Sequence, residues 1–192
     1  MKAFKTALAV CVMALVPAFA GAQPGGDLGA LVQAAESGDM AARFELGNRY
    51  LNGNGVLQDA SEALRWFTLA AEQGSRNAQY NVGVIYLNGV GVEPDATKAL
   101  EWFHRAADNG DAPSQFALGV LHFEGLPELP VDIAQAYKWF LLAGAAGDEM
   151  AGANAVLVQE MLAPEVVEAM QEEARQWIEN FNARRAANTS AQ

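Results

Sequence analysis

The chain has 192 residues, room for one ordinary domain, and its 52% hydrophobic and 18% charged residues exclude disorder of the whole chain. The formal net charge of −11 disfavours a nucleic-acid partner, because the phosphate backbone would be repelled. The single cysteine, Cys11, lies in the N-terminal segment, so the rest of the chain has no disulfide, thiolate nucleophile or cysteine metal site.

The first 22 residues have the features of a secretory signal peptide. Lys2 and Lys5 precede an uncharged stretch over residues 6–20, and small residues follow at Ala20 and Ala22. The uncharged stretch is shorter than the ~20 residues needed to span a bilayer. We therefore expect cleavage after Ala22, with cleavage after Ala20 as the alternative. The product would be periplasmic or secreted and would have no membrane segment.

Residues 39–148 contain an internal repeat of three units, predicted at 39–74, 75–110 and 111–148. The markers are Gly47, Gly83 and Gly119, then Trp66, Trp102 and Trp139, and the helix N-caps Asp39, Ser75, Asp111 and Asp148. In each unit, apolar residues at helical spacing precede a glycine-rich turn, and an aspartate begins a second helix. In the first unit, Asp59 and Glu62 predict a capping box in which each side chain bonds a backbone N–H of the other.

Very small and very large residues alternate in these helix pairs. Gly47 and the paired alanines would let helices approach closely, while the tryptophan, phenylalanine and tyrosine positions would fill the space between layers. We expect Trp66 and Trp102 to be buried alike. Neither helix can bury its apolar face alone, so neighbouring units must stack.

A known family carries this pattern. Residues 42–74 read Ala-x-x-x-Leu-Gly-x-x-Tyr-x-x-Gly-x-Gly-Val and then Asp-x-x-x-Ala-x-x-Trp-Phe-x-x-Ala-Ala-Glu-x-Gly, which closely resembles the Sel-one-like repeat, a relative of the tetratricopeptide repeat. The resemblance covers residues 39–148. It implies an all-α fold, an α/α superhelix in which antiparallel helix pairs form a right-handed solenoid.

The flanks of the repeats follow the same plan less closely. Residues 23–38 are expected to form a lead-in and a lone helix, and residues 149–184 a degenerate capping repeat in which Val156 replaces the glycine and Gln159 the tyrosine. Pro164 should begin the last helix. Residues 185–192 are expected to form a flexible tail. The loop of the third unit, residues 125–130, has two prolines and lacks the second glycine, so its turn should differ.

The two histidines of the chain do not form a catalytic or metal-binding pattern. His122 stands where the earlier units have Tyr50 and Tyr86, which indicates a structural role, and His104 near Glu101 indicates a solvated charge pair. The spacing typical of a zinc site is absent. The glycine pairs recur as turns and lack the strand and lysine of a phosphate loop. We expect no catalytic residue, no metal and no cofactor.

A partner-binding groove is implied by the family resemblance, because the first helices of tetratricopeptide units line a concave surface. The residues expected to line it are Asn48, Arg49, Asn81, Val84, Ile85, Asn88, Val120 and Leu121. The four apolar residues among them would anchor the partner. The alternative for these four is packing against the next helix. The loops around Gly55, Gly91 and Leu126 are the second candidate surface.

The leading functional hypothesis is a monomeric bacterial scaffold or regulator of the cell envelope, without enzyme activity, that binds a segment of another protein. The negative charge favours a basic partner. The alternative function is an envelope hydrolase acting on peptidoglycan or a related substrate. A third possibility, glycan binding by the repeated tryptophans, is disfavoured by their expected core positions.

Overall fold

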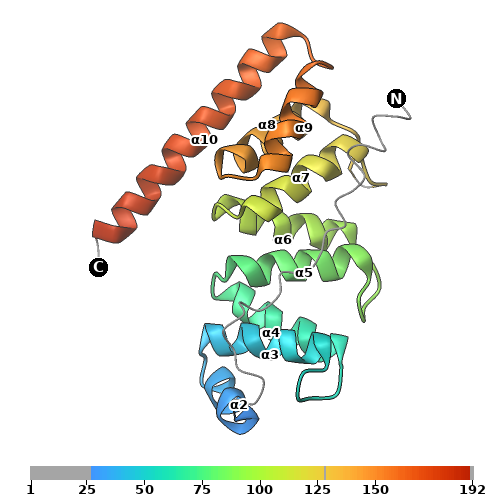
Figure 1. Cartoon of the computed structure of the whole chain (residues 1–192), viewed down its shortest axis with the longest axis vertical. Helices are drawn as coiled ribbons and strands as arrows, with labels where there is room; N and C mark the ends of the chain where they lie inside the picture. The colour runs from blue at the N-terminus through green and yellow to red at the C-terminus, as the bar shows by residue number, and fades with distance from the viewer. Residues whose placement is uncertain (1–26, 128, 191–192) are drawn as a thin grey trace. The chain divides into compact units, whose positions relative to one another are not determined.

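The computed structural model describes residues 27–127 and 129–190, which form nine α-helices and no β-strand (Figure 1). The helices are α2 (Leu28–Glu36), α3 (Met40–Asn52), α4 (Ala60–Glu72), α5 (Arg76–Asn88), α6 (Ala96–Asp108), α7 (Ala112–Glu124), α8 (Ile133–Ala145), α9 (Glu149–Gln159) and α10 (Pro164–Ser190). The predicted signal peptide lies outside the described residues. Among the described helices, none combines the length and the apolar character needed to cross a membrane. The all-α fold class is confirmed.

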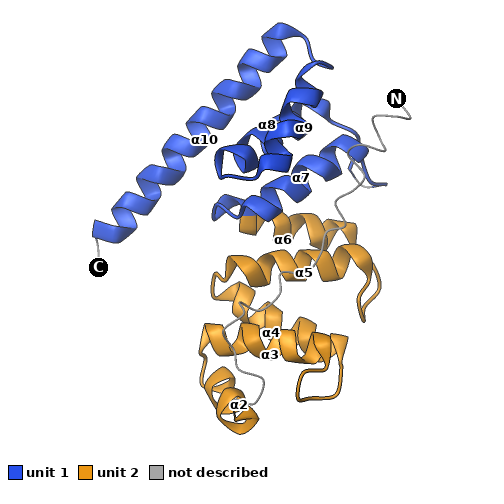
Figure 2. Cartoon of the chain, in the orientation of Figure 1, with its two compact units in different colours: residues 1–12, 107–192 blue, residues 13–106 orange. Residues whose placement is uncertain are grey.

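The described chain divides into two compact units, whereas its length suggested one (Figure 2). Residues 27–106 form the N-terminal unit, in which α2, α3, α4 and α5 pack in sequence order. Residues 107–127 and 129–190 form the C-terminal unit, in which α8 packs against α7, α9 and α10. Repeats contact mainly their sequence neighbours, so no single core has to join distant parts of the chain.

A glycine brings the two helices of each repeat into close contact, as predicted. Gly47 lies against Phe67, Gly83 against Phe103, and Gly119 against Phe140. A Cβ atom added to these glycines would lie 2.7, 2.7 and 2.6 Å from a ring carbon, so only glycine leaves room for the ring. Each of these rings also packs against an aromatic ring of the first helix. The ring centroids are 5.5, 5.8 and 5.6 Å apart, and the angle between the ring planes is 52° in all three pairs.

The two helices of each repeat are also joined by one backbone hydrogen bond. The N–H of Asp59 donates to the carbonyl of Tyr50 at 2.9 Å. The equivalent bonds join Asp95 to Tyr86 and Asp132 to His122, both at 2.8 Å. The carboxylate of Asp59 accepts from the N–H groups of Ser61 and Glu62, which confirms its capping role. The reciprocal half of the capping box was predicted wrongly: Tyr50 already takes the Asp59 N–H, and Glu62 pairs with Arg65 at 2.8 Å.

Each first helix is bound to the helix before it by a side chain, a contact that we call the repeat joint. The donor side chains Arg43, Gln79 and Gln115 reach the carbonyl oxygens of Ala35, Ala71 and Ala107 at 3.0, 3.0 and 3.3 Å. The predicted caps Asp39, Ser75 and Asp111 begin the same three helices, and Asp148 begins α9. At the last joint, Gly144 and Gly152 replace the alanine and the donor, and a Cβ on Gly144 would lie 3.1 Å from the Cα of Gly152.

The loop of the third repeat departs from the other two, as predicted. Gly53 and Gly89 end α3 and α5 in the left-handed conformation. Gly125 ends α7 at φ 76° and ψ 162° instead. The loop then forms an isolated antiparallel bridge, in which Leu126 and Leu129 exchange backbone hydrogen bonds of 2.7 and 3.0 Å. Gly125 and Asp132 are seven positions apart, whereas Gly53 and Asp59 are six apart, so this loop is one residue longer. The bridge accommodates the extra residue, and Asp132 keeps its place at the start of α8.

The C-terminal helix α10 begins at Pro164, as predicted, but it runs on to Ser190. The flexible tail expected from residue 185 is therefore wrong for residues 185–190. Alanine is the best helix former, and two alanines lie in this stretch. Thr189 and Ser190 also donate their hydroxyls to the carbonyls of Arg185 and Ala186 at 2.9 Å, so both hydroxyls are bonded within the helix.

α4 packs along α3, α8 packs along α7, and α6 contacts α5 through Phe103 and Gly83, whereas α10 packs along α8. The hydroxyl of Tyr137 on α8 donates to Gln159 at 3.1 Å and accepts from Gln171 of α10 at 2.9 Å. Lys138 pairs with Glu173 of α10 at 3.2 Å. Residues 149–184 therefore cap the C-terminal unit without forming a fourth helix pair of the same kind.

Candidate functional site

Most of the residues predicted to line the groove are interior. Their exposed fractions are 3% for Asn48, 0% for Asn81, 1% for Val84, 0% for Ile85, 5% for Val120 and 4% for Leu121. The expectation that the apolar four are exposed anchors is corrected, and the alternative of interior packing is what the structure shows. Arg49 is partly buried and pairs with Glu45 at 3.0 Å. Of the eight, Asn88 is the one that is exposed.

Two aspartates at the starts of helices, and the lysine that pairs with one of them, have shifted pKa values. Hydrogen bonds from the Ser61 hydroxyl and the Glu62 N–H lower the pKa of Asp59. The N–H and the ammonium group of Lys98 lower the pKa of Asp95, and this carboxylate in turn raises the pKa of Lys98. Within the described ranges, no three His, Cys, Asp or Glu side chains gather closely enough to hold a metal ion. These shifts therefore report local capping.

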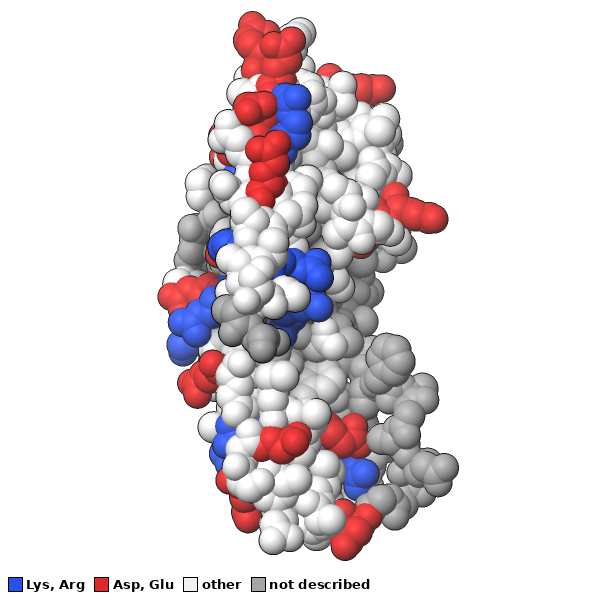
Figure 3. Space-filling model, turned by 90° about the vertical axis from the view of Figure 1, so that its left-hand side faces the viewer, with Lys and Arg blue, Asp and Glu red and all other residues white. Residues whose placement is uncertain are grey.

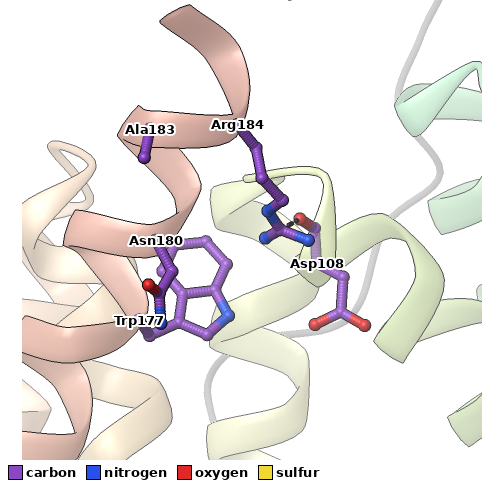
Figure 4. A pocket seen from close by; sticks show the side chains of 5 residues that line it. All are labelled: Asp108, Trp177, Asn180, Ala183 and Arg184. Atoms are coloured by element: carbon purple, nitrogen blue, oxygen red, sulfur yellow. Dashed lines mark hydrogen bonds between the residues drawn. The ribbon is translucent and has the colours of Figure 1, made fainter. Parts of the chain in front are cut away.

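A pocket of about 520 Å³ lies in the C-terminal unit, between the second half of α10 and the end of α6 (Figure 4). It is lined by Asp108, Trp177, Asn180, Ala183 and Arg184. The guanidinium of Arg184 donates to the backbone carbonyl of Asp108 at 3.5 Å, which leaves the Asp108 carboxylate directed away from that bond (Figure 4). The pocket offers an indole, an amide and charges of both signs, which can hold a polar chain segment by hydrogen bonds.

Trp177 is held in this pocket by aromatic packing. Its indole stacks on Phe181 with ring centroids 5.1 Å apart and an angle of 13°. Phe181 in turn lies against Gly110, where an added Cβ would come within contact distance of the ring. The guanidinium of Arg185 lies over the ring of Phe181, 5.7 Å from its centroid. The end of α10 is therefore fixed against the turn between α6 and α7 by these aromatic contacts.

Six large apolar side chains stand clearly exposed in the described part of the chain. They are Met40, Leu57, Val131, Met150, Val156 and Met161. Leu57 and Val131 lie in loops between helices, and Leu57 is 90% exposed. Met150 and Val156 lie on α9, and Met161 lies two residues after the helix end. The C-terminal unit thus has three of these side chains within 12 residues.

Three consecutive segments, residues 41–75, 76–111 and 112–148, match the Sel1 repeat. The chain belongs to the Sel1 repeat family. Sel1 repeat proteins generally act as scaffolds for protein–protein interaction. The predicted family is therefore confirmed, and the matched segments begin one or two residues after the predicted units.

Two solved Sel1-type structures are similar to this one. A Sel1 repeat protein from Oxalobacter formigenes is 40% identical, with a TM-score of 0.61, over 67% of this chain and 96% of that one. A protective antigen present in uropathogenic Escherichia coli strains, which displays an SLR fold, is 29% identical with a TM-score of 0.65. The match covers 80% of this chain but only 32% of the antigen. No curated protein matches the chain significantly.

The interior groove residues belong to Sel1 helices that are surrounded on all sides. Residues 78–85 of α5 and residues 114–121 of α7 are each buried without a break. Eight residues make more than two helical turns, so every direction around the axis is covered. A signal for this was present in the sequence, because residues 77–92 carry no charged side chain.

Acidic side chains gather in the first half of α10, with Arg175 among them and paired to Glu172, and basic side chains lie further along the helix (Figure 3). Glu165, Glu168, Glu172 and Glu173 are exposed in its first half, and Arg184 and Arg185 near its end. Glu165 lies in the first turn, where a carboxylate complements the helix dipole, and the last turn has no basic residue. The basic end also adjoins the pocket, where Arg184 is the guanidinium donor.

Proposed function

We propose that this Sel1 repeat protein is an exported, monomeric scaffold of the bacterial cell envelope that binds a segment of another protein and has no enzyme activity of its own. Membership of the Sel1 family carries the proposal, because its members generally act as interaction scaffolds. Export rests on Lys2, Lys5 and the uncharged stretch that follows them, with cleavage after Ala22.

Binding takes place on outward surfaces, because the expected groove is largely interior. The exposed apolar side chains in the inter-helix loops and on α9, together with the pocket beside Arg184, supply contacts of two kinds. Apolar side chains at the centre of a contact contribute most of the binding energy. The guanidinium of Arg184 can pair with a carboxylate of the bound segment.

Site-specific photo-crosslinking in the bacterium that expresses the protein tests this function. A photoreactive residue is placed in turn at four exposed positions, Leu57, Asn88, Val131 and Arg184, and cells without illumination serve as the control. We expect at least one of the four positions to form a light-dependent adduct with a partner protein, and any further positions that react should form adducts with that same protein. Absence of any adduct, or turnover of peptidoglycan by the purified protein that is lost in His104→Ala, would contradict the scaffold function.

A further inference from the structure

The helix α9 lacks a partner that the first helix of each complete repeat has. In those repeats, a phenylalanine ring of the second helix lies over a glycine of the first helix. In α9 that position is Val156, which is 63% exposed. The following helix α10 is drawn to α8 by the bonds of Tyr137 and Lys138. In the described part of the chain, one side of α9 is therefore left at the surface.

This side of α9 is apolar. It carries Met150, Ala153 and Val156, and Met161 lies two residues after the helix end; all four are exposed. We call these four residues the α9 outer face. The opposite side of the helix holds its buried residues, Ala151, Asn154, Ala155 and Val158. The helix is thus fixed by one face and presents a second apolar face outward, and methionines on such a face adapt readily to a bound partner.

The surroundings of the α9 outer face are acidic. From residue 139 to residue 174 the sequence contains seven carboxylates and no Lys, Arg or His. Glu149 and Glu160 lie at the two ends of the side that carries Ala153 and Val156, because spacings of four, seven and eleven residues return to one side of a helix. A second copy of the same face would bring like charges together, whereas a basic partner would be attracted.

We propose that the α9 outer face docks an amphipathic helix of a partner protein, with Lys or Arg residues flanking its apolar stripe, where a complete repeat has its own second helix. This inference rests on the proposed scaffold function and names its surface and the class of its partner. The apolar stripe supplies affinity, and the basic flanks speed association and set the orientation. In the complete repeats a phenylalanine ring lies directly over the backbone at a glycine, but the side chain of Val156 occupies that space in α9. Aliphatic side chains of the partner helix should therefore fit this face better than an aromatic ring.

Binding of synthetic peptides to the chain from Gln23 onward tests the surface and its charge preference. The probe is a helical peptide of about 18 residues, five turns, with a leucine stripe and lysine flanks, and a matched peptide has glutamate in place of lysine. The double variant Met150→Gln, Val156→Gln is compared with Met40→Gln, Leu57→Gln, which changes exposed apolar side chains of the N-terminal unit. Circular dichroism confirms that both variants remain folded.

We expect the lysine peptide to bind the α9 variant at least tenfold more weakly than it binds the unaltered protein. Its affinity for the control variant should lie within twofold of its affinity for the unaltered protein. We expect the glutamate peptide to bind at least tenfold more weakly than the lysine peptide. The inference is overturned if neither peptide binds, if both bind equally, or if the two variants weaken binding alike, since basic peptide would then be held elsewhere on an acidic protein.

Crosslinking from Val156 in cells separates this inference from the scaffold function. An adduct with a basic amphipathic helix of another protein supports both. Adducts from the exposed positions tested above, but none from Val156, would overturn the inference and leave the scaffold function standing. No adducts from any position would overturn both. An adduct with a second copy of this chain would overturn the inference, because the face would then be a dimer contact.

Discussion

The contact between Gly119 and Phe140 gives the sharpest test of the packing within a repeat. In Gly119→Ala, the new Cβ would start 2.6 Å from the ring, whereas ordinary contacts begin at 3.4 Å, so the ring must move by about 0.8 Å. Overpacking of this kind costs roughly 1–3 kcal/mol. Replacing glycine by alanine inside a helix has the opposite effect and raises the free energy of unfolding by about 1 kcal/mol. The net loss of unfolding free energy should therefore be at most about 2 kcal/mol.

Gly152→Ala is the matched control, because Gly152 lies in a helix of the same unit and an added Cβ would meet nothing within 4 Å. It should gain about 1 kcal/mol. The propensity gain cancels when the two variants are compared, so their difference measures the packing cost, roughly 1–3 kcal/mol. With a urea slope of ~2 kcal/mol/M, the unfolding midpoints followed by circular dichroism should differ by about 0.5–1.5 M. Equal midpoints would refute the close-contact explanation.

Three further outcomes are expected. Trp66→Ala should cost roughly 3–5 kcal/mol in urea unfolding, and Trp102→Ala clearly less, because Trp66 is only 5% exposed and Trp102 is half-buried; equal losses would contradict this. The pKa of Asp95 is lowered in the folded protein, so its carboxylate stabilises the fold at pH values above the ordinary pKa of 3.8. This stabilisation is lost as the pH falls through the lowered pKa of the folded state. The melting temperature of Asp95→Asn should therefore fall less steeply below about pH 4 than that of the unaltered protein. Mass measurement of the exported protein should show an N-terminus at Gln23, and an intact Met1 form in the cytoplasm would contradict export.

The helices and their ends could be predicted because local chemistry determines them. Asp39, Asp111 and Asp148 accept the N–H bonds that a cap should accept, and Gly53 adopts the positive φ that ends its helix. The role of Gly47 was also predictable, since a small residue at the crossing point of two helices is needed for a close approach.

The features that the sequence did not reveal depend on neighbours far along the chain. Val84 and Leu121 look like outward residues on a helix with one apolar face, but their helices are surrounded. The tryptophans of the three repeats share a sequence position, yet Trp102 is less buried than Trp66 and Trp139. The path of α10 is set by Tyr137 of α8, a residue that no periodicity singles out. The candidate site therefore moved from the expected groove to the surface of α9.

The repeat joint has a consequence for how such a chain can change its length. The block 75–110 contains a donor near its start, Gln79, and an acceptor near its end, Ala107. In a duplicate of this block inserted after residue 110, the copy of Gln79 could donate to the carbonyl of Ala107, and the copy of Ala107 could accept from Gln115. Gene duplication in steps of 36 residues would therefore leave every repeat joint with a donor and an acceptor. Beyond Gly144 and Gly152 this pairing ends, and new repeats added there would have no such bond to join.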